Sequence, residues 1–139
     1  MFRFYHPVTV RFSDLDLLGH VNNARYLTYM EQGRVAYFRH LGLRRAGELT
    51  FGFILAHAAV DFLHPIRLDA QVRVGVRVAR LGRKSFTMAY RLEQPESGVV
   101  YATGETVQVT YDYQQEQTVP IPEAWRQIIA RFEGIPPGP

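Results

Sequence analysis

The sequence contains no cysteine among its 139 residues. This absence excludes a disulfide framework, a thiolate nucleophile and every zinc site that uses sulfur ligands. Any chemistry that the chain performs must therefore come from oxygen and nitrogen groups.

Long apolar runs are also missing, since no stretch approaches the roughly 18 consecutive apolar residues of a membrane-spanning helix. The first ten residues, MFRFYHPVTV, have neither a long apolar run nor a small-residue cleavage site. The hydrophobic share of 47% and the charged share of 21% are typical of a soluble globular protein. We expect a cytoplasmic protein with no membrane partner and a single domain over residues 1–139, whose tail at 134–139 is irregular.

Neither sign of charge is in large excess, because the formal net charge is only +3. Arg greatly outnumbers Lys, and the guanidinium fork suits phosphate groups, so a phosphorylated ligand fits as readily as nucleic acid. The arginines at 73, 77, 80 and 83 are able to form a basic stripe, but no recognised nucleic-acid motif accompanies them. We expect no nucleic-acid partner.

Apolar residues that recur with a period of two predict strands. In residues 2–12 the even positions are mostly apolar, which indicates one buried face. Short connections at 82–84 and 95–98 are typical of hairpin loops, so the last three strands form an antiparallel meander. The predicted strands lie within residues 2–12, 51–62, 72–79, 86–92 and 107–113.

A helical period predicts one long helix over residues 23–41, with Gly42 as its stop signal. Its apolar residues cover much of the cylinder, which predicts that a curved sheet wraps around it. A short amphipathic helix, EAWRQIIARF, follows Pro122. The order of elements predicts the α+β class, with one long central helix wrapped by a five-stranded antiparallel sheet and a short C-terminal helix.

The connection between the first strand and the long helix is rich in polar residues. Asp16 precedes the helix N-terminus, where free backbone N–H groups and the positive end of the helix dipole are able to hold an oxyanion. A carboxylate beside such donors is the minimum equipment for acyl transfer. The alternative is that Asp14, Asp16, Asn22 and Asn23 are turn and cap residues, which is their commonest use.

The segment FSDLDLLGHVNNARYLTYME at 12–31 resembles the start of the 4-hydroxybenzoyl-CoA thioesterase-like branch of the hot-dog superfamily. The resemblance lies in the order aromatic-x-Asp-x-Asp, then Gly19, then His-Val-Asn-Asn, then Tyr26 on the helix. It continues through FLHPIRLD at 62–69 and RKSF at 83–86, so only the C-terminal tail is unmatched.

The resemblance implies a hot-dog fold, dimers whose sheets join edge to edge, often tetramers, and active sites between subunits. It also implies hydrolysis of an acyl-CoA thioester without a metal, and no cofactor other than the coenzyme A of the substrate. By position, Asp16 matches the catalytic Asp and the backbone N–H near Asn22 and Asn23 matches the donor to the thioester carbonyl. Asp14 is then structural.

Two features of related enzymes are missing from this chain. Plant acyl-carrier-protein thioesterases have Asn where this chain has Leu18, and other hot-dog thioesterases use a helix Glu after a His-Gly-Gly turn. Glu31 lies on the predicted helix, where an ion-pair role is the commoner one. His57 and His64 lack the spacing of a metal triad, so we expect no metal site.

Further residues are candidates for binding or orienting the substrate. His20 is a candidate for substrate orientation or proton transfer, or else a helix-entry residue bonded to backbone. Tyr26 is a candidate for the acyl pocket, although aromatic residues at this spacing are more often core. Arg83, Lys84 and Ser85 offer two cations and a hydroxyl to the phosphates of coenzyme A, or else form a solvated turn.

The sequence therefore favours an acyl-CoA thioesterase in which Asp16 is the nucleophile or the general base. A non-catalytic acyl-CoA-binding module is the alternative, and a hydratase is a third hypothesis that lacks its Asp and His pair. The acyl group depends on how Tyr26, Phe51, Phe53 and partner-chain residues meet.

Overall fold

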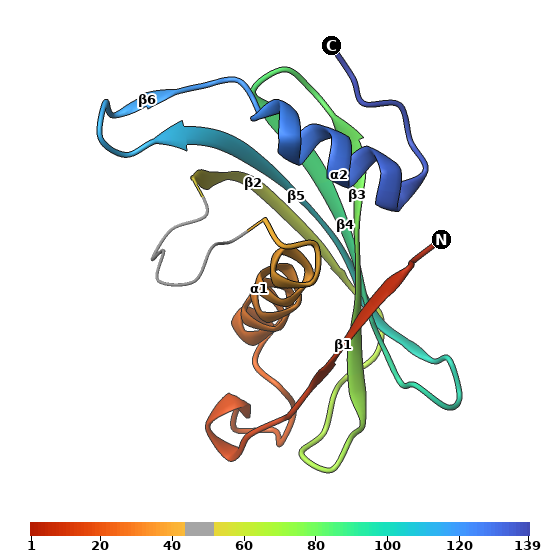
Figure 1. Ribbon diagram of the computed structural model, residues 1–139. Helices are drawn as coiled ribbons and strands as arrows, with labels where there is room; N and C mark the ends of the chain where they lie inside the picture. Colours follow the sequence, from red (N-terminus) through yellow and green to blue (C-terminus); the bar gives the residue numbers. More distant parts are fainter. Residues whose placement is uncertain (44–51) are drawn as a thin grey trace.

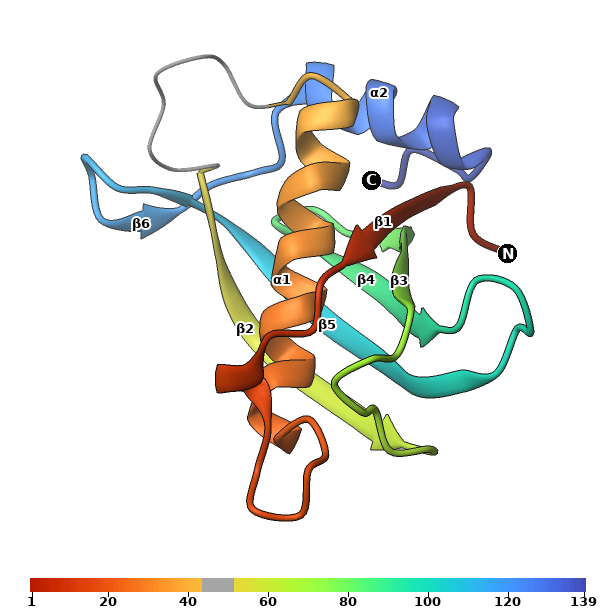
Figure 2. The same cartoon turned by 90° about the horizontal axis from the view of Figure 1, so that it is seen from below.

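The computed structural model describes residues 1–43 and 52–139. It belongs to the α+β class, as the sequence predicts, with α1 lying against one face of a curved antiparallel sheet (Figures 1 and 2). In chain order the elements are β1 (Phe4–Val8), a 3-10 helix (Phe12–Asp14), α1 (Asn23–His40), β2 (Phe53–Phe62), β3 (Val72–Leu81), β4 (Ser85–Glu93), β5 (Val100–Asp112), β6 (Gln117–Thr118) and α2 (Glu123–Glu133).

The strand order in the sheet is β1-β3-β4-β5-β2, and all neighbours are antiparallel. The two-residue strand β6 pairs only with β5 and adds a short extension to the five expected strands. The meander of β3, β4 and β5 and both hairpin loops are confirmed. The wrapped helix confirms the expected hot-dog arrangement, and β1 and β2 form the two edges of the main sheet (Figure 2).

The helix α1 packs closely on the sheet. Tyr29, Met30 and Phe38 are at most 1% exposed, and all three belong to the hydrophobic core. A Cβ atom at Gly33 would lie 2.6 Å from Cγ1 of Val74, so the helix backbone rests directly on β3. This close approach explains a glycine in a helix interior, where it otherwise costs stability.

The ends of both helices follow from their capping residues. Asn22 caps α1, and Gly42 follows its C-terminal end with a φ of +71°, so the predicted stop is confirmed. In α2, Glu133 accepts hydrogen bonds from the hydroxyl of Tyr37 and from the backbone N–H of Val78, which ties the C-terminal helix to α1 and to β3. No described helix has the length and apolar content needed to cross a membrane.

The first strand is shorter than predicted. It ends at Val8, and Phe12 is 82% exposed where the alternating pattern placed it in the buried face. The backbone N–H of Arg11 donates to the carboxylate of Asp14, so the chain turns into a 3-10 helix before Phe12 is able to extend the strand. The second strand begins at Phe53, while the predicted start at Phe51 lies outside the described residues.

Candidate active site

A cavity of about 260 Å³ lies where α1 begins and β2 ends, and we call it the Asp16 cavity. It brings together Asp16, His20, Asn23 and Tyr26, four of the residues that the sequence singled out. The remaining wall comes from Val21, from Phe62 at the end of β2 and from the chain that follows β2. The full lining is Asp16, His20, Val21, Asn23, Tyr26, Phe62, Leu63, His64 and Pro65.

A tight turn positions Asp16 at the edge of this cavity. The backbone N–H of Asp16 donates to the carbonyl of His20 at 2.7 Å, and Gly19 closes the turn with a φ of +79°, which favours glycine. One carboxylate oxygen, Oδ1, accepts from the N–H groups of Leu18 at 2.9 Å and of His20 at 3.2 Å. The other oxygen, Oδ2, has no hydrogen-bond partner among the described residues, so it is available to a substrate.

The two asparagines at the start of α1 have different roles. The side chain of Asn22 caps the helix by accepting from the N–H of Ala24 at 2.9 Å, and its own N–H donates to the carbonyl of Asp14 at 2.8 Å. Within the described residues, the N–H of Asn23 has no such partner, and Asn23 lines the cavity. The candidate oxyanion donor is therefore the backbone N–H of Asn23. Asn22 instead caps α1 and holds the connection between β1 and α1 in place.

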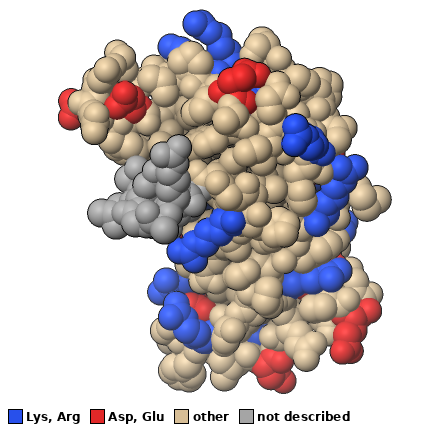
Figure 3. All heavy atoms as spheres, viewed as in Figure 1, with Lys and Arg blue, Asp and Glu red and all other residues tan. Residues whose placement is uncertain are grey.

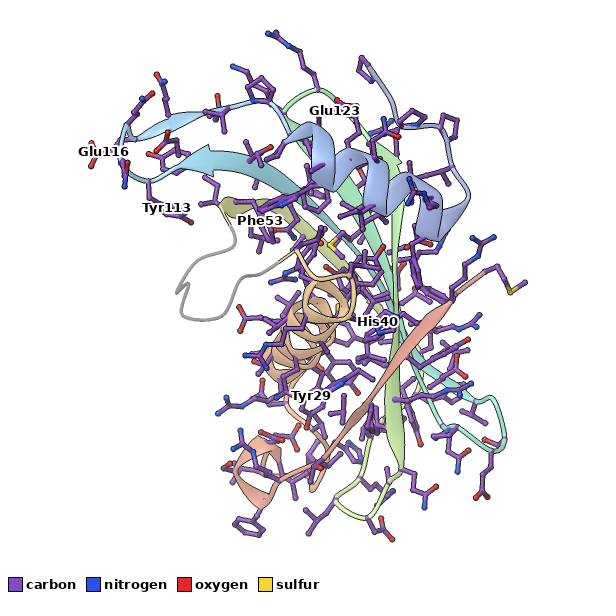
Figure 4. The ribbon with its side chains drawn as sticks, viewed as in Figure 1. Tyr29, His40, Phe53, Tyr113, Glu116 and Glu123 are labelled. Carbon is purple, nitrogen blue, oxygen red and sulfur yellow. The ribbon has the colours of Figure 1, made fainter. Side chains whose placement is uncertain are left out.

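Asp14 is a buried structural carboxylate. Its Oδ2 accepts from the hydroxyl of Tyr29 at 2.6 Å and from the N–H of Arg11 at 3.0 Å, and Arg25 lies 3.7 Å from Oδ1. Burial alone would raise the pKa of Asp14, but these hydrogen bonds and charges lower it below its ordinary value. Figure 4 shows Tyr29 near the end of α1 that meets the connection from β1. The hydrogen bond between Tyr29 and Asp14 therefore anchors the turn that holds Asp16 to α1.

The chain that follows β2 forms the opposite wall. The N–H of Val21 donates to the carbonyl of Ile66 at 2.8 Å, and His20 forms an isolated β-bridge with Arg67. The ring of Tyr26 packs edge-on against Phe62 with the centroids 4.9 Å apart. Burial raises the pKa of Tyr26, so its side chain contributes a neutral wall rather than a charge.

His64 lines the same cavity, although the sequence reasoning considered it only as a metal ligand. Its Nδ1 lies 2.9 Å from the carbonyl oxygen of Val100. Because a carbonyl only accepts, this nitrogen carries a proton, and in the neutral ring Nε2 is left as an acceptor. The sequence shows only a His-Pro pair after an apolar strand as a sign of this role. The contact with Val100 that orients the ring is tertiary and is not visible in the sequence.

Arg83, Lys84 and Ser85 do not meet Asp16 within one chain. Their hairpin joins β3 to β4 at the end of the sheet where β2 begins, whereas the Asp16 cavity lies where β2 ends. Lys84 Nζ donates to the hydroxyl of Thr118 at 3.5 Å, and the carbonyl of Arg83 accepts from Arg126 at 3.1 Å. A single protomer therefore does not place this hairpin beside the candidate carboxylate.

The arginines of the predicted basic stripe are partly paired with a carboxylate. Arg73 and Arg91 both pair with the buried Glu93 at 2.8 Å, which neutralises part of the predicted basic stripe. On the face shown in Figure 3, Lys and Arg side chains gather along the right side, and Asp and Glu side chains lie near the top and the bottom. Among the described residues, no three His, Cys, Asp or Glu side chains form a group able to hold a metal ion.

Known proteins resemble this chain over most of its length. The model of the thioesterase-like superfamily matches residues 10–129. The crystal structure of a thioesterase from Thermus thermophilus, complexed with coenzyme A and Zn, is 39% identical, covers 97% of each chain and has a TM-score of 0.84. A 1,4-dihydroxy-2-naphthoyl-CoA hydrolase of Synechococcus elongatus is 29% identical over 87% of this chain and 93% of its own length. The protein YsmA of Bacillus subtilis is 32% identical over 78% and 72%.

Proposed function

The chain belongs to the thioesterase-like superfamily and is a thioester hydrolase, and we propose that it cleaves acyl-CoA with Asp16 as its catalytic carboxylate. One observation carries the proposal. Asp16 and Asn23 line the same cavity, and among the described residues neither Oδ2 of Asp16 nor the backbone N–H of Asn23 has a hydrogen-bond partner. A carboxylate and an oxyanion donor are the two groups that acyl transfer to water requires.

In the proposed reaction the N–H of Asn23 donates to the thioester carbonyl oxygen, and the dipole of α1 stabilises the negative charge that develops there. Asp16 then acts by one of two routes. Its Oδ2 attacks the carbonyl carbon and expels the coenzyme A thiolate, after which water hydrolyses the acyl-enzyme anhydride. Alternatively it takes a proton from a water molecule that attacks directly. Both routes yield the free acid and coenzyme A, and neither needs a resident cofactor.

We further propose that the working unit is a homodimer, or a homotetramer of two such dimers. The strand β2 pairs with β5 along one side only, and within the described part of the sheet its other side is a ten-residue open edge. Leu55 and Phe62 on this strand are each 48% exposed. A long apolar edge is a template for another strand, so antiparallel pairing of β2 with β2 of a second copy supplies the missing neighbour.

This pairing also bears on the predicted contacts with coenzyme A. A two-fold axis through β2 brings the β3–β4 hairpin of one protomer to the end of the sheet that holds the Asp16 cavity of the other. We therefore assign Arg83, Lys84 and Ser85 of the partner subunit to the coenzyme A phosphates, which cations and hydroxyls bind well. We expect the enzyme to act in the cytoplasm on acyl-CoA.

A panel of acyl-CoA esters, assayed for free thiol, tests the proposed function. We expect thiol release with at least one ester at a rate that rises with enzyme concentration. Isothermal titration of the same esters separates the alternative. Tight binding with no thiol release from any ester would show a binding module and contradict the proposal.

A further inference from the structure

The backbone of His64 is held firmly at the wall of the Asp16 cavity. Its N–H donates to the carbonyl of Tyr101 at 3.1 Å, and its carbonyl accepts from the hydroxyl of Tyr26 at 3.4 Å. Pro65 follows, and the α conformation is disfavoured for a residue that precedes a proline. These contacts fix the direction in which the imidazole leaves the chain, although the residue is exposed.

The imidazole ring of His64 is oriented as well. Its Nδ1 donates to the carbonyl oxygen of Val100 at 2.9 Å, so Nε2 is an acceptor in the neutral ring. The two nitrogens lie on opposite edges of the ring. Because His64 lines the cavity and Val100 does not, the edge that carries Nε2 is the one left for the cavity. Among the described residues Nε2 has no hydrogen-bond partner, so it is available to a water molecule.

His20 lines the same cavity, but its ring has no such anchor. Its backbone N–H donates to Oδ1 of Asp16, and its carbonyl accepts from the N–H of Asp16. Within the described part of the chain, no hydrogen bond holds the imidazole of His20. A catalytic group performs best when its neighbours fix its rotamer. The geometry therefore favours His64 over His20 as a base at this cavity.

The nucleophilic route needs a proton acceptor other than Asp16. Once Oδ2 of Asp16 has attacked the thioester, this carboxylate is bound in the anhydride and accepts no proton. The water that cleaves the anhydride must lose a proton, and a positioned base accelerates such a step by about 10²–10⁴. Asp14 does not serve, because it is buried and already accepts from Tyr29 and Arg11. His64 offers an oriented acceptor at the cavity itself.

We propose that Asp16 acts as a nucleophile and that His64 is the general base that hydrolyses the acyl-enzyme anhydride. The proposal rests on the thioesterase function proposed above. Nε2 takes one proton from water while the water oxygen bonds to the acyl carbon and the bond from that carbon to Oδ2 of Asp16 breaks. The Asp16 carboxylate is restored, and the imidazolium passes its proton to the coenzyme A thiolate. One acyl-CoA and one water thus yield one free acid and one coenzyme A.

Rapid-quench measurement of thiol release tests this role, with the ester that the wild type hydrolyses fastest. In His64→Gln the first step keeps its rate and the second loses its base, so kcat should fall by about 10²–10⁴. A burst of thiol stoichiometric with active sites should precede the slow steady rate. Mass spectra of the acid-quenched variant should show the acyl group on the peptide that contains Asp16.

His40→Gln is the matched control. His40 is an exposed histidine at the last position of α1, at the other end of the helix from Tyr29 and the Asp16 turn (Figure 4). This variant should keep the wild-type kcat and the wild-type progress curve. A loss in His64→Gln that His40→Gln does not share is therefore specific to the cavity.

Added imidazole separates a chemical role from a structural one. In His64→Ala the missing side chain leaves room for a free imidazole, which should raise the steady rate of thiol release by supplying the base. Asp16→Asn forms no anhydride, so the same imidazole should not raise its rate. His64→Ala also replaces His64→Gln in the burst measurement should that variant fail to fold.

Three results would overturn the role of His64. They are an unchanged kcat in folded His64→Gln, a lower kcat without a burst or an acyl adduct, and no response of His64→Ala to imidazole. The last two would show that His64 acts on the first step or on the structure. Absence of thiol release from every ester with the wild type would instead overturn the thioesterase function, so the two failures are distinguishable.

Discussion

Two carboxylates that lie only two positions apart illustrate what the sequence can and cannot show at the scale of residues. Asp14 is buried and hydrogen-bonded to Tyr29, whereas Asp16 is exposed at a cavity and its Oδ2 has no hydrogen-bond partner in the described part of the chain. The local sequence pattern predicts that both are turn residues. Only the family resemblance predicted a structural role for Asp14 and a catalytic role for Asp16. His64 was missed because its orientation depends on Val100, a residue distant in the sequence.

The backbone donor is predicted to be Asn23, and a proline tests it. Asn23 is the first helical residue of α1, a position that tolerates proline, and Asn22 has the extended ψ of 138° that a following proline needs. Asn23→Pro removes the N–H and should lower kcat by about 10²–10³. Asn23→Ala keeps the N–H and should lose much less. Equal rates for the two variants would show that this N–H is not the oxyanion donor.

Asp14 is predicted to stabilise the fold in a pH-dependent way. Its folded-state pKa is lowered, so its contribution is present above its ordinary pKa and is lost as the pH falls through the folded value. Asp14→Asn should lower the free energy of unfolding by about 1–3 kcal/mol at pH 7, and by less in acid, in denaturant titrations at both pH values. Glu96→Gln, in the exposed turn between β4 and β5, is the control. A loss that is equal at both pH values would contradict this assignment.

At the scale of elements, the sequence predicted the long helix, the strands and the hairpins, because each has its own periodicity and stop signal. The first strand was overextended because the Asp14 contact that ends it is not visible in an alternating pattern. Leu27, an apolar residue of the predicted helix stripe, is 40% exposed. A helical period alone does not show which of its apolar residues the sheet covers.

The close approach of α1 to β3 predicts a contrast between two glycines. A Cβ at Gly33 would meet branched Val74 and Val76 at 2.6 and 2.9 Å, whereas one at Gly104 would meet the flexible end of Met30 at 2.6 Å. Gly33→Ala should therefore destabilise the protein by about 1–3 kcal/mol in thermal and denaturant unfolding, despite the better helix propensity of alanine. Gly104→Ala should cost less. The reverse order would mean that α1 sits further from the sheet.

At the scale of the whole molecule, β2 pairs with a neighbouring strand on one side only within the described part of the sheet. The sequence alone suggested the dimer only through the resemblance, since periodicity does not show which strand lies at an edge. The exposed apolar residues on β2 supply an independent physical reason. The assembly and the active site are therefore one prediction, because the proposed coenzyme A site takes its β3–β4 hairpin from the partner subunit.

Ala58→Arg tests this prediction. Ala58 lies near the middle of β2 and is exposed, so a long charged side chain there should disturb pairing with a second copy. Sedimentation should show a shift towards monomers, with a parallel loss of thioesterase activity. Gln115→Arg, in the exposed turn after β5, adds the same charge away from β2 and should change neither property. A fully active monomer would contradict a shared site.

The most direct test of the account is the Asp16→Asn variant, measured for turnover and for binding in one preparation. Because the substitution keeps the size of the side chain but removes its charge, the variant should remain folded and bind acyl-CoA within a few-fold of the wild type. Its kcat should fall by about 10²–10⁴, the range for loss of a catalytic base, while Glu96→Gln in the exposed turn between β4 and β5 stays fully active. Turnover near the wild-type rate in a folded Asp16→Asn protein would contradict the central claim.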